Sequence, residues 1–283
     1  MGQSRSKHVV TATPRIPKWS PAEITGLAAI IFAALIFTTA PGLAILSLSS
    51  FLFLCFIAPF LPRFGFFLPV IHHGGKGVTA VALTFDDGPS PASTPDILRL
   101  LTRHKLKATF FVIGRQAAAY PELIGDIIAG GHSIANHSYR HDSLLMLRSY
   151  TELQRDIAKT QEILARFGIK PLLFRPPAGV TNPRLKGVTA ALNLTTVNFS
   201  CRAFDGGNKR INNLTARVMN RLRPGDIIML HDTCPRPETL KQYWLTELDQ
   251  LFKNMRQKYT VLPLENIIHQ PVMSLISGAE NDG

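Results

Sequence analysis

One long uncharged stretch near the N-terminus decides how this chain is organised. Residues 24–62 contain no Asp, Glu, Lys or Arg over 39 consecutive positions. A bilayer is crossed by about 20 apolar residues per helix, so the run suffices for two short spans, or for one span and an interfacial segment. Pro41 divides it, because proline disfavours helical geometry in the preceding residue. We therefore predict a membrane-anchoring helical hairpin of residues 24–40 and 43–59.

A cleaved signal peptide is the alternative, but it has a short apolar core and a small-residue cleavage site, whereas here a second apolar stretch follows at once. Residues 1–21 hold four Lys or Arg side chains and no carboxylate, a bias that places the N-terminus in the cytoplasm. Two spans would return the rest of the chain to the cytoplasm, and one span would put it outside. Arg63, just after the run, favours the cytoplasmic side slightly.

The formal net charge of +12 carries information about partners. Beyond the N-terminal stretch there is no long Lys/Arg run of the kind that tracks nucleic-acid phosphates, so we expect no nucleic-acid partner. Anionic membrane lipids or a phosphate-bearing substrate fit this charge better. The three cysteines are too few to predict a disulfide framework.

After the uncharged run, short apolar segments alternate with helix-like segments. Strands are predicted at 78–85, 108–113, 172–174, 195–199, 226–230 and 260–262, and helices at 95–104, 121–129, 150–167, 183–192, 214–222 and 240–257. This alternation is typical of parallel strands joined by crossover helices, and at about 200 residues either a barrel or a doubly wound sheet is expected. The predicted parts are a basic cytoplasmic N-terminus (1–21), an anchor (22–62), a linker (63–77), the main domain (78–270) and a flexible tail (271–283).

Two adjacent carboxylates stand where the first predicted strand ends, in the segment Thr-Phe-Asp-Asp-Gly-Pro at 84–89. Active sites of parallel barrels are built at the carboxyl ends of strands, so Asp86 and Asp87 are candidates for acid–base or metal chemistry. Asp-Gly-Pro is also a turn signal, and an aspartate can simply cap the next helix. The motif alone decides nothing.

Two histidines, His137 and His141, stand four residues apart. If the backbone is helical there, they project on the same side. Neutral imidazoles at this spacing suit a divalent metal, and one carboxylate would complete an Asp-His-His set that leaves a position for water on a zinc-like ion. Spacing does not decide which aspartate would be the ligand, and two solvent-facing histidines are the alternative.

Two more polar residues follow predicted strands. Arg175 precedes a rigid diproline turn, where its guanidinium could hold a carboxylate by paired hydrogen bonds. His231 follows the apolar strand at 226–230, where an imidazole that titrates near neutral pH can act as a general acid. A surface arginine and a hydrogen-bonded strand-end histidine are the alternatives.

Together these motifs resemble the polysaccharide deacetylase family (NodB-like, carbohydrate esterase family 4). Its pattern is a T-F-D-D-G-P block, an H-S/T-x-x-H block, an R-x-P-x-G-like block, an Asp-containing block and a final L-x-H block, and the match covers residues 78–262. The resemblance implies an α/β fold, a distorted (β/α) barrel of the NodB-homology type. It also implies a divalent metal, with zinc the first candidate and cobalt the second.

By this resemblance, three residues would hold the metal: Asp87, His137 and His141. Four would be catalytic: Asp86 as general base, Arg175 to orient it, His231 to protonate the leaving amine, and Asp205 to hold and tune His231. Three would contact the substrate: Leu230, which would line the pocket for the acyl methyl group, Pro176 and Ala178. These roles agree with amide hydrolysis, which needs one group to activate the nucleophile and an opposed acid for a poor leaving group.

Two positions depart from the family pattern. An aromatic residue often follows the diproline, and a Trp often follows the Asp of the fourth block, whereas this chain has Ala178 and Gly206. Loss of both aromatics would open the sugar-binding surface. The resemblance therefore does not imply classical chitin or peptidoglycan specificity.

The expected function is removal of an N-acetyl or N-formyl group from an amino sugar at the bacterial cytoplasmic (inner) membrane. An anchored enzyme fits a membrane-associated glycan, such as a polyprenyl-phosphate-linked sugar or lipid A, because anchoring raises the effective concentration at the bilayer. A cell-wall or exported polysaccharide is the rival substrate if the domain faces outward. The other hypotheses are a catalytically silent sugar-binding membrane protein and an O-acetyl esterase that uses the same residues.

Overall fold

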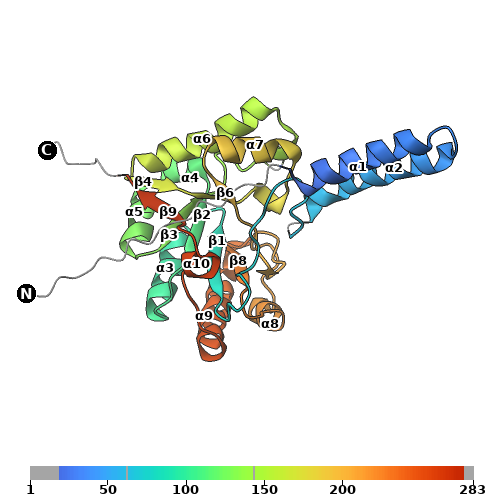
Figure 1. Cartoon of the computed structure of the whole chain (residues 1–283). Helices are drawn as coiled ribbons and strands as arrows, with labels where there is room; N and C mark the ends of the chain where they lie inside the picture. Colours follow the sequence, from blue (N-terminus) through green and yellow to red (C-terminus); the bar gives the residue numbers. More distant parts are fainter. Residues whose placement is uncertain (1–18, 62, 143, 277–283) are drawn as a thin grey trace, which may run out of the picture.

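The computed structural model describes residues 19–61, 63–142 and 144–276. These residues form a helical hairpin that projects from an α/β body (Figure 1). The basic N-terminus predicted for residues 1–21 lies almost wholly outside the described residues.

The hairpin consists of α1 (Pro21–Ile36) and α2 (Pro41–Ile57), followed by the short 3-10 helix η1 (Ala58–Phe60). Ser20 begins α1 with a capping box that includes Glu23, and α2 begins at Pro41, where the sequence predicted the break. Gly26 lets the two helices approach closely, since a Cβ there would lie 2.7 Å from the ring of Phe51. Most of the large apolar side chains of both helices face outward.

By length and composition, the helical stretch Pro41–Phe60 is the one in the described ranges that could cross a bilayer, and α1 is apolar but shorter. The predicted pair of apolar helices is therefore present. Whether they lie in a membrane stays a prediction.

The body is built on one sheet of seven parallel strands in the order β6-β5-β3-β2-β1-β8-β7. The strands are β1 (Ala82–Asp86), β2 (Thr109–Val112), β3 (Ser133–Asn136), β5 (Leu173–Phe174), β6 (Thr195–Thr196), β7 (Cys201–Arg202) and β8 (Ile227–His231). Strands β6 and β7 are its two edges among the described residues. The sheet is thus an open, parallel half-barrel rather than a closed barrel, and its α/β class is as predicted.

Helices cover the outer face of the half-barrel (Figure 1). They are α3 (Thr94–Arg103), α4 (Gly114–Ala119), α5 (Pro121–Ala129), α6 (Tyr150–Ala165), α7 (Pro183–Ala191), α8 (Leu214–Met219) and α9 (Lys241–Lys258), and the short α10 (Leu264–Ile268) packs on β1. Further 3-10 turns are η2 (Leu145–Leu147), η3 (Pro177–Gly179) and η4 (Glu238–Leu240).

Alternation along the strands assigns each side chain to one face of the sheet. Leu83, Phe85 and Leu230 belong to the apolar cluster that packs against the outer helices. Ala82 and Ile227 belong to a different cluster, on the opposite face of the same strands. Residues two positions along from these, on β1 and β8, therefore also point to the inner face.

Two segments predicted to lie outside the main domain are packed on it. The linker expected at 63–77 is packed on the body, because Phe66, Phe67 and Leu68 are buried and Ile71 bridges to Val197. The tail expected from residue 271 contains β9 (Met273–Leu275), which pairs antiparallel with β4 (Ile169–Pro171). Apolar side chains in both segments have partners in the core, so these segments form part of the folded body.

Candidate active site

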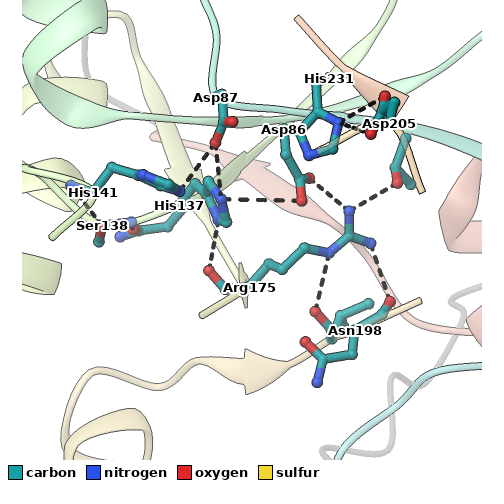
Figure 2. Close-up of polar contacts among 12 residues, drawn as sticks. Asp86, Asp87, His137, Ser138, His141, Arg175, Asn198, Asp205 and His231 are labelled. Atoms are coloured by element: carbon teal, nitrogen blue, oxygen red, sulfur yellow. Dashed lines mark hydrogen bonds and ion pairs between the residues drawn. The ribbon is translucent and has the colours of Figure 1, made fainter. Parts of the chain in front are cut away.

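A cavity of about 400 Å³ opens at the carboxyl ends of the parallel strands. Its lining includes Asp86 at the end of β1, His137 directly after β3, and His231 at the end of β8. The parallel pairing of β1 and β8 places Asp86 opposite His231 in the register. The fold therefore gathers residues that are far apart in the sequence (Figure 2).

Asp87, His137 and His141 form a cluster with the chemistry of a metal site. An Asp87 carboxylate oxygen lies 3.4 Å from Nε2 of His137 and 3.0 Å from Nε2 of His141, and one ligand atom from each residue falls within 4.8 Å of the others. Nδ1 of His137 lies 2.7 Å from the carbonyl oxygen of Arg175, so it donates there and leaves Nε2 free to be a ligand. One carboxylate and two imidazoles are a donor set that fits a zinc-like ion.

The two histidines do not lie on a helix, so the helical condition for their projecting on the same side is not met. They belong to the loop after β3, where Ser138 and His141 have left-handed backbone conformations, with φ of 67° and 53°. The ring centroids are nonetheless 4.9 Å apart. Loop geometry, and not helical periodicity, brings the imidazoles together.

The charges of this cluster are mutually stabilised. Burial alone would raise the pKa of Asp87, but the hydrogen bonds and charges of His137 and His141 outweigh it and hold that pKa well below its usual range. Burial likewise opposes protonation of His141, whose pKa is nevertheless raised by its hydrogen bond to Asp87. Asp87 is therefore anionic at neutral pH.

Asp86 is held by the fully buried Arg175 (Figure 2). Nη1 of Arg175 donates to Oδ1 of Asp86 at 2.6 Å and to the hydroxyl of Thr84 at 2.8 Å. Its other nitrogens donate to the carbonyl oxygens of Val197 and Asn198, and its guanidinium lies 3.8 Å from the ring centroid of the residue beneath it, Phe111. The second carboxylate oxygen, Oδ2, lies 4.0 Å from Nε2 of His137. Arg175 therefore fixes one oxygen of Asp86 and leaves the other beside the cluster of Asp87, His137 and His141.

His231 is held by Asp205. Nδ1 of His231 lies 2.9 and 3.0 Å from the two carboxylate oxygens of Asp205, which is itself buried. Burial alone would lower the pKa of His231, but the hydrogen bond and charge of Asp205 outweigh it and raise that pKa to about 9. His231 is thus protonated at neutral pH.

The segment that follows Asp87 packs closely against Asp232. The buried carboxylate of Asp232 accepts hydrogen bonds from the hydroxyls of Ser93 and Thr94 at 2.7 and 2.6 Å. Gly88 lies against this carboxylate, and a Cβ there would come within 2.2 Å of it. The glycine is therefore required for the close approach of the two segments.

Two of the three predicted substrate contacts do not line the cavity. Leu230 points outward into the apolar core, because it alternates with Met229 and His231, which line the cavity. Pro176 is buried and does not line the cavity either. Ala178 does line it, with φ at 55°. Met229, two residues before His231, occupies the position in the cavity wall that was expected for leucine.

Two aromatic side chains that the sequence motifs did not identify line the cavity. Phe199 and Phe204 line the cavity beside Gly206, and Phe204 is 49% exposed. The guanidinium of Arg202 lies 4.2 Å from the ring centroid of Phe204. Phe204 directly precedes Asp205 in the Asp-containing block, and this position could have identified it from the sequence as a residue near the site.

Comparison with known proteins agrees with this geometry. A family model described as polysaccharide deacetylase matches residues 73–197. A chitooligosaccharide deacetylase of Sinorhizobium fredii is 33% identical over 174 residues, or 61% of this chain and 80% of the relative. A peptidoglycan-N-acetylglucosamine deacetylase of Bacillus cereus is 36% identical over 180 residues, or 63% of this chain and 64% of the relative.

Solved structures show the same relationship. The crystal structure of the Bc1960 peptidoglycan N-acetylglucosamine deacetylase superposes with a TM-score of 0.65 at 32% identity, over 72% of this chain and 94% of that one. A family 4 carbohydrate esterase from Streptomyces lividans, in complex with acetate, gives a TM-score of 0.57 at 31% identity, over 66% and 93% of the two chains. The fold, the matched sequence and the site geometry lead to one conclusion: the chain belongs to the polysaccharide deacetylase family of carbohydrate N-deacetylases.

Proposed function

We propose that this protein is a metal-dependent N-deacylase that removes an acetyl or formyl group from an amino sugar of a membrane-associated, lipid-linked glycan. The observation that carries the hydrolytic part is a pair of proton-transfer groups that line one cavity. Asp86, held by Arg175, and His231, held by Asp205, are register partners at the ends of the neighbouring strands β1 and β8.

Asp87, His137 and His141 would hold the metal. The cluster offers one anionic oxygen and two imidazole nitrogens, a set that suits zinc first and cobalt second. A bound divalent ion supplies Lewis acidity: it polarises the amide carbonyl and lowers the pKa of water to about 7.

The side chains of the protein account for the proton transfers. Asp86 accepts the proton of the attacking water through its free carboxylate oxygen, and Arg175 keeps that oxygen oriented. His231, protonated at neutral pH, donates its Nε2 proton to the amide nitrogen as the carbon–nitrogen bond breaks. Asp205 stabilises the imidazolium before transfer and holds Nδ1, so Nε2 is the nitrogen that donates.

The projecting hairpin supports the membrane part of the proposal. Two adjacent apolar helices expose most of their large side chains, which is costly in water and favourable in a bilayer. A lipid-linked amino sugar is presented at the same surface. Cell-wall glycan is the second candidate, because relatives of this chain are named for peptidoglycan.

The test is acyl release by the zinc-loaded full chain in detergent, with polyprenyl-phosphate-linked N-acetyl and N-formyl amino sugars and with N-acetylglucosamine oligomers. We expect the wild type to release acid, and Asp86→Asn to lose at least about a hundredfold in rate, as when a general base is removed. Asp126→Asn, on the exposed face of α5, is the matched control. Equal rates in Asp86→Asn and the wild type would refute the mechanism, and release from acetyl esters alone would indicate an esterase.

A further inference from the structure

A second cavity, of about 700 Å³, lies beside the active site at the base of the hairpin. We call it the arginine cavity. One part of its wall, residues 61–64 without the undescribed residue 62, directly follows η1. The two cavities share Phe199, Arg202 and Phe204, so they adjoin one another.

Three cations line the arginine cavity: Arg63, Arg202 and Arg221. None of them forms an ion pair with a carboxylate in the described parts of the chain. Arg202 and Arg221 approach the Phe204 ring, at 4.2 and 4.4 Å from its centroid, and Arg63 donates to the carbonyl of Ser200. Their positive charges are therefore held together without a directly paired carboxylate among the described residues.

The electrostatics are those of a site for an anion. Burial is the largest influence on Arg202 and lowers its pKa. The negative charge of Asp205 opposes this, and the smaller like charges of Arg221 and Arg63 add to the lowering. Guanidinium groups present a planar fork of donors that matches phosphate oxygens. A phosphate between these arginines would relieve their mutual repulsion.

The rest of the wall is mostly apolar. Leu61 and Phe64 are exposed side chains that continue the apolar surface of α2 toward the cavity. A free sugar phosphate would leave this surface unused. An anionic group joined to a long apolar chain would use both the arginines and the apolar wall.

We propose that the arginine cavity binds the phosphate of a glycan esterified to a long apolar chain, with the chain along Leu61 and Phe64 and the amino sugar in the adjoining active site. The inference rests on the proposed function and deepens it, because it identifies the residues that recognise the lipid-linked substrate. The phosphate then sits one cavity away from the reacting amide.

The test compares two substrates of equal chain length in phospholipid-free detergent: a long-chain alkyl phosphate ester of N-acetylglucosamine and a neutral long-chain alkyl N-acetylglucosaminide. We expect wild-type kcat/KM to be higher for the phosphate ester. Arg221→Gln should lower the ratio of the two kcat/KM values roughly tenfold, the loss expected for one charge-assisted hydrogen bond, and Arg221→Lys should lower it less. Arg166→Gln, an exposed position after α6 that lines neither cavity, should leave the ratio unchanged.

An inhibition constant tests phosphate recognition even in a variant with low activity. A long-chain alkyl phosphate without sugar should inhibit hydrolysis of N-acetylglucosamine oligomers competitively, with a Ki roughly tenfold higher in Arg221→Gln. Equal wild-type kcat/KM for the two alkyl substrates would overturn the inference. The inference would also be overturned if Arg221→Gln weakened binding of the protein to phosphatidylglycerol vesicles but left the ratio of the kcat/KM values unchanged. The arginines would then bind bilayer headgroups. The proposed function is judged separately. If the wild type hydrolyses N-acetylglucosamine oligomers and Asp86→Asn does not, the N-deacylase function stands even when the phosphate inference fails. If no substrate releases acid, the N-deacylase function itself is refuted.

Discussion

Asp205 and His231 form a carboxylate–imidazole pair that sets the pH range of catalysis in the proposed mechanism. With its pKa raised to about 9, His231 carries its proton through the neutral range and loses it as the pH rises through about 9. In Asp205→Asn the burial persists without the anion, so the pKa falls. We expect the alkaline limb of the pH profile of kcat/KM to move down by at least about one unit.

The same sign applies to stability. The contribution of the pair to the free energy of unfolding is fully present below the unfolded-state pKa of His231, about 6.5, and is lost as the pH rises through the folded-state pKa.

Asp126→Asn is the control for the pH profile of kcat/KM. An alkaline limb that stays in place in Asp205→Asn, whatever the rate, would show that His231 is not the acid.

Met229 and Leu230 are adjacent but face opposite sides of the sheet, so their truncation should have different effects. Met229→Ala enlarges the cavity beside His231. It should raise kcat/KM for an N-propionyl sugar relative to the N-acetyl sugar. Leu230→Ala leaves a hole in the outer core and should cost about 2–5 kcal/mol of unfolding free energy without that change in selectivity. Denaturant melts and paired kinetics measure both effects, and a shift in acyl selectivity from Leu230→Ala would contradict this assignment.

At the scale of elements, sequence reasoning located strand ends better than whole strands. Asp86, Asp87 and His231 were placed correctly because long apolar runs precede them. Strand β3 was missed because Ser-Ile-Ala-Asn lacks an apolar run, and β7 has two residues. The cluster of His137 and His141 was found from its residue types, but its loop geometry depends on left-handed residues that spacing does not reveal.

Strand β9 should contribute measurably to stability, although its position near the C-terminus suggested a flexible tail. Val272, just before it, is 1% exposed, and the sulfur of Met273 accepts a hydrogen bond from the backbone of Ile134 at 3.4 Å. A chain ended after Pro271 should lose at least about 2 kcal/mol of unfolding free energy relative to one ended after Ile276, the value of one buried aliphatic side chain. Equal denaturation midpoints for the two truncations would show that β9 adds nothing.

At the scale of the whole molecule, metal binding should be linked to folding. Asp87, His137 and His141 come from two loops that meet only in the folded chain. An ion that binds the folded state alone stabilises it by about 2.7 kcal/mol at a free concentration one hundred times its Kd. Zinc should therefore raise the Tm of the chelator-treated protein and restore activity, and His141→Gln should reduce both effects. A bound zinc that leaves Tm unchanged would contradict the linkage.

The hairpin is attached to the body by several contacts. Ala22 donates its backbone N–H to the carbonyl of Phe66, Lys186 pairs with Glu23 at 2.7 Å, and Phe51 packs against the cluster that contains Phe66. If the hairpin is embedded in a bilayer, these contacts fix the height of the catalytic cavity above the lipid surface. The enzyme would then select substrates by their distance from the membrane as well as by their chemistry. It would reach a sugar next to the membrane and pass over the same sugar farther along a growing polymer.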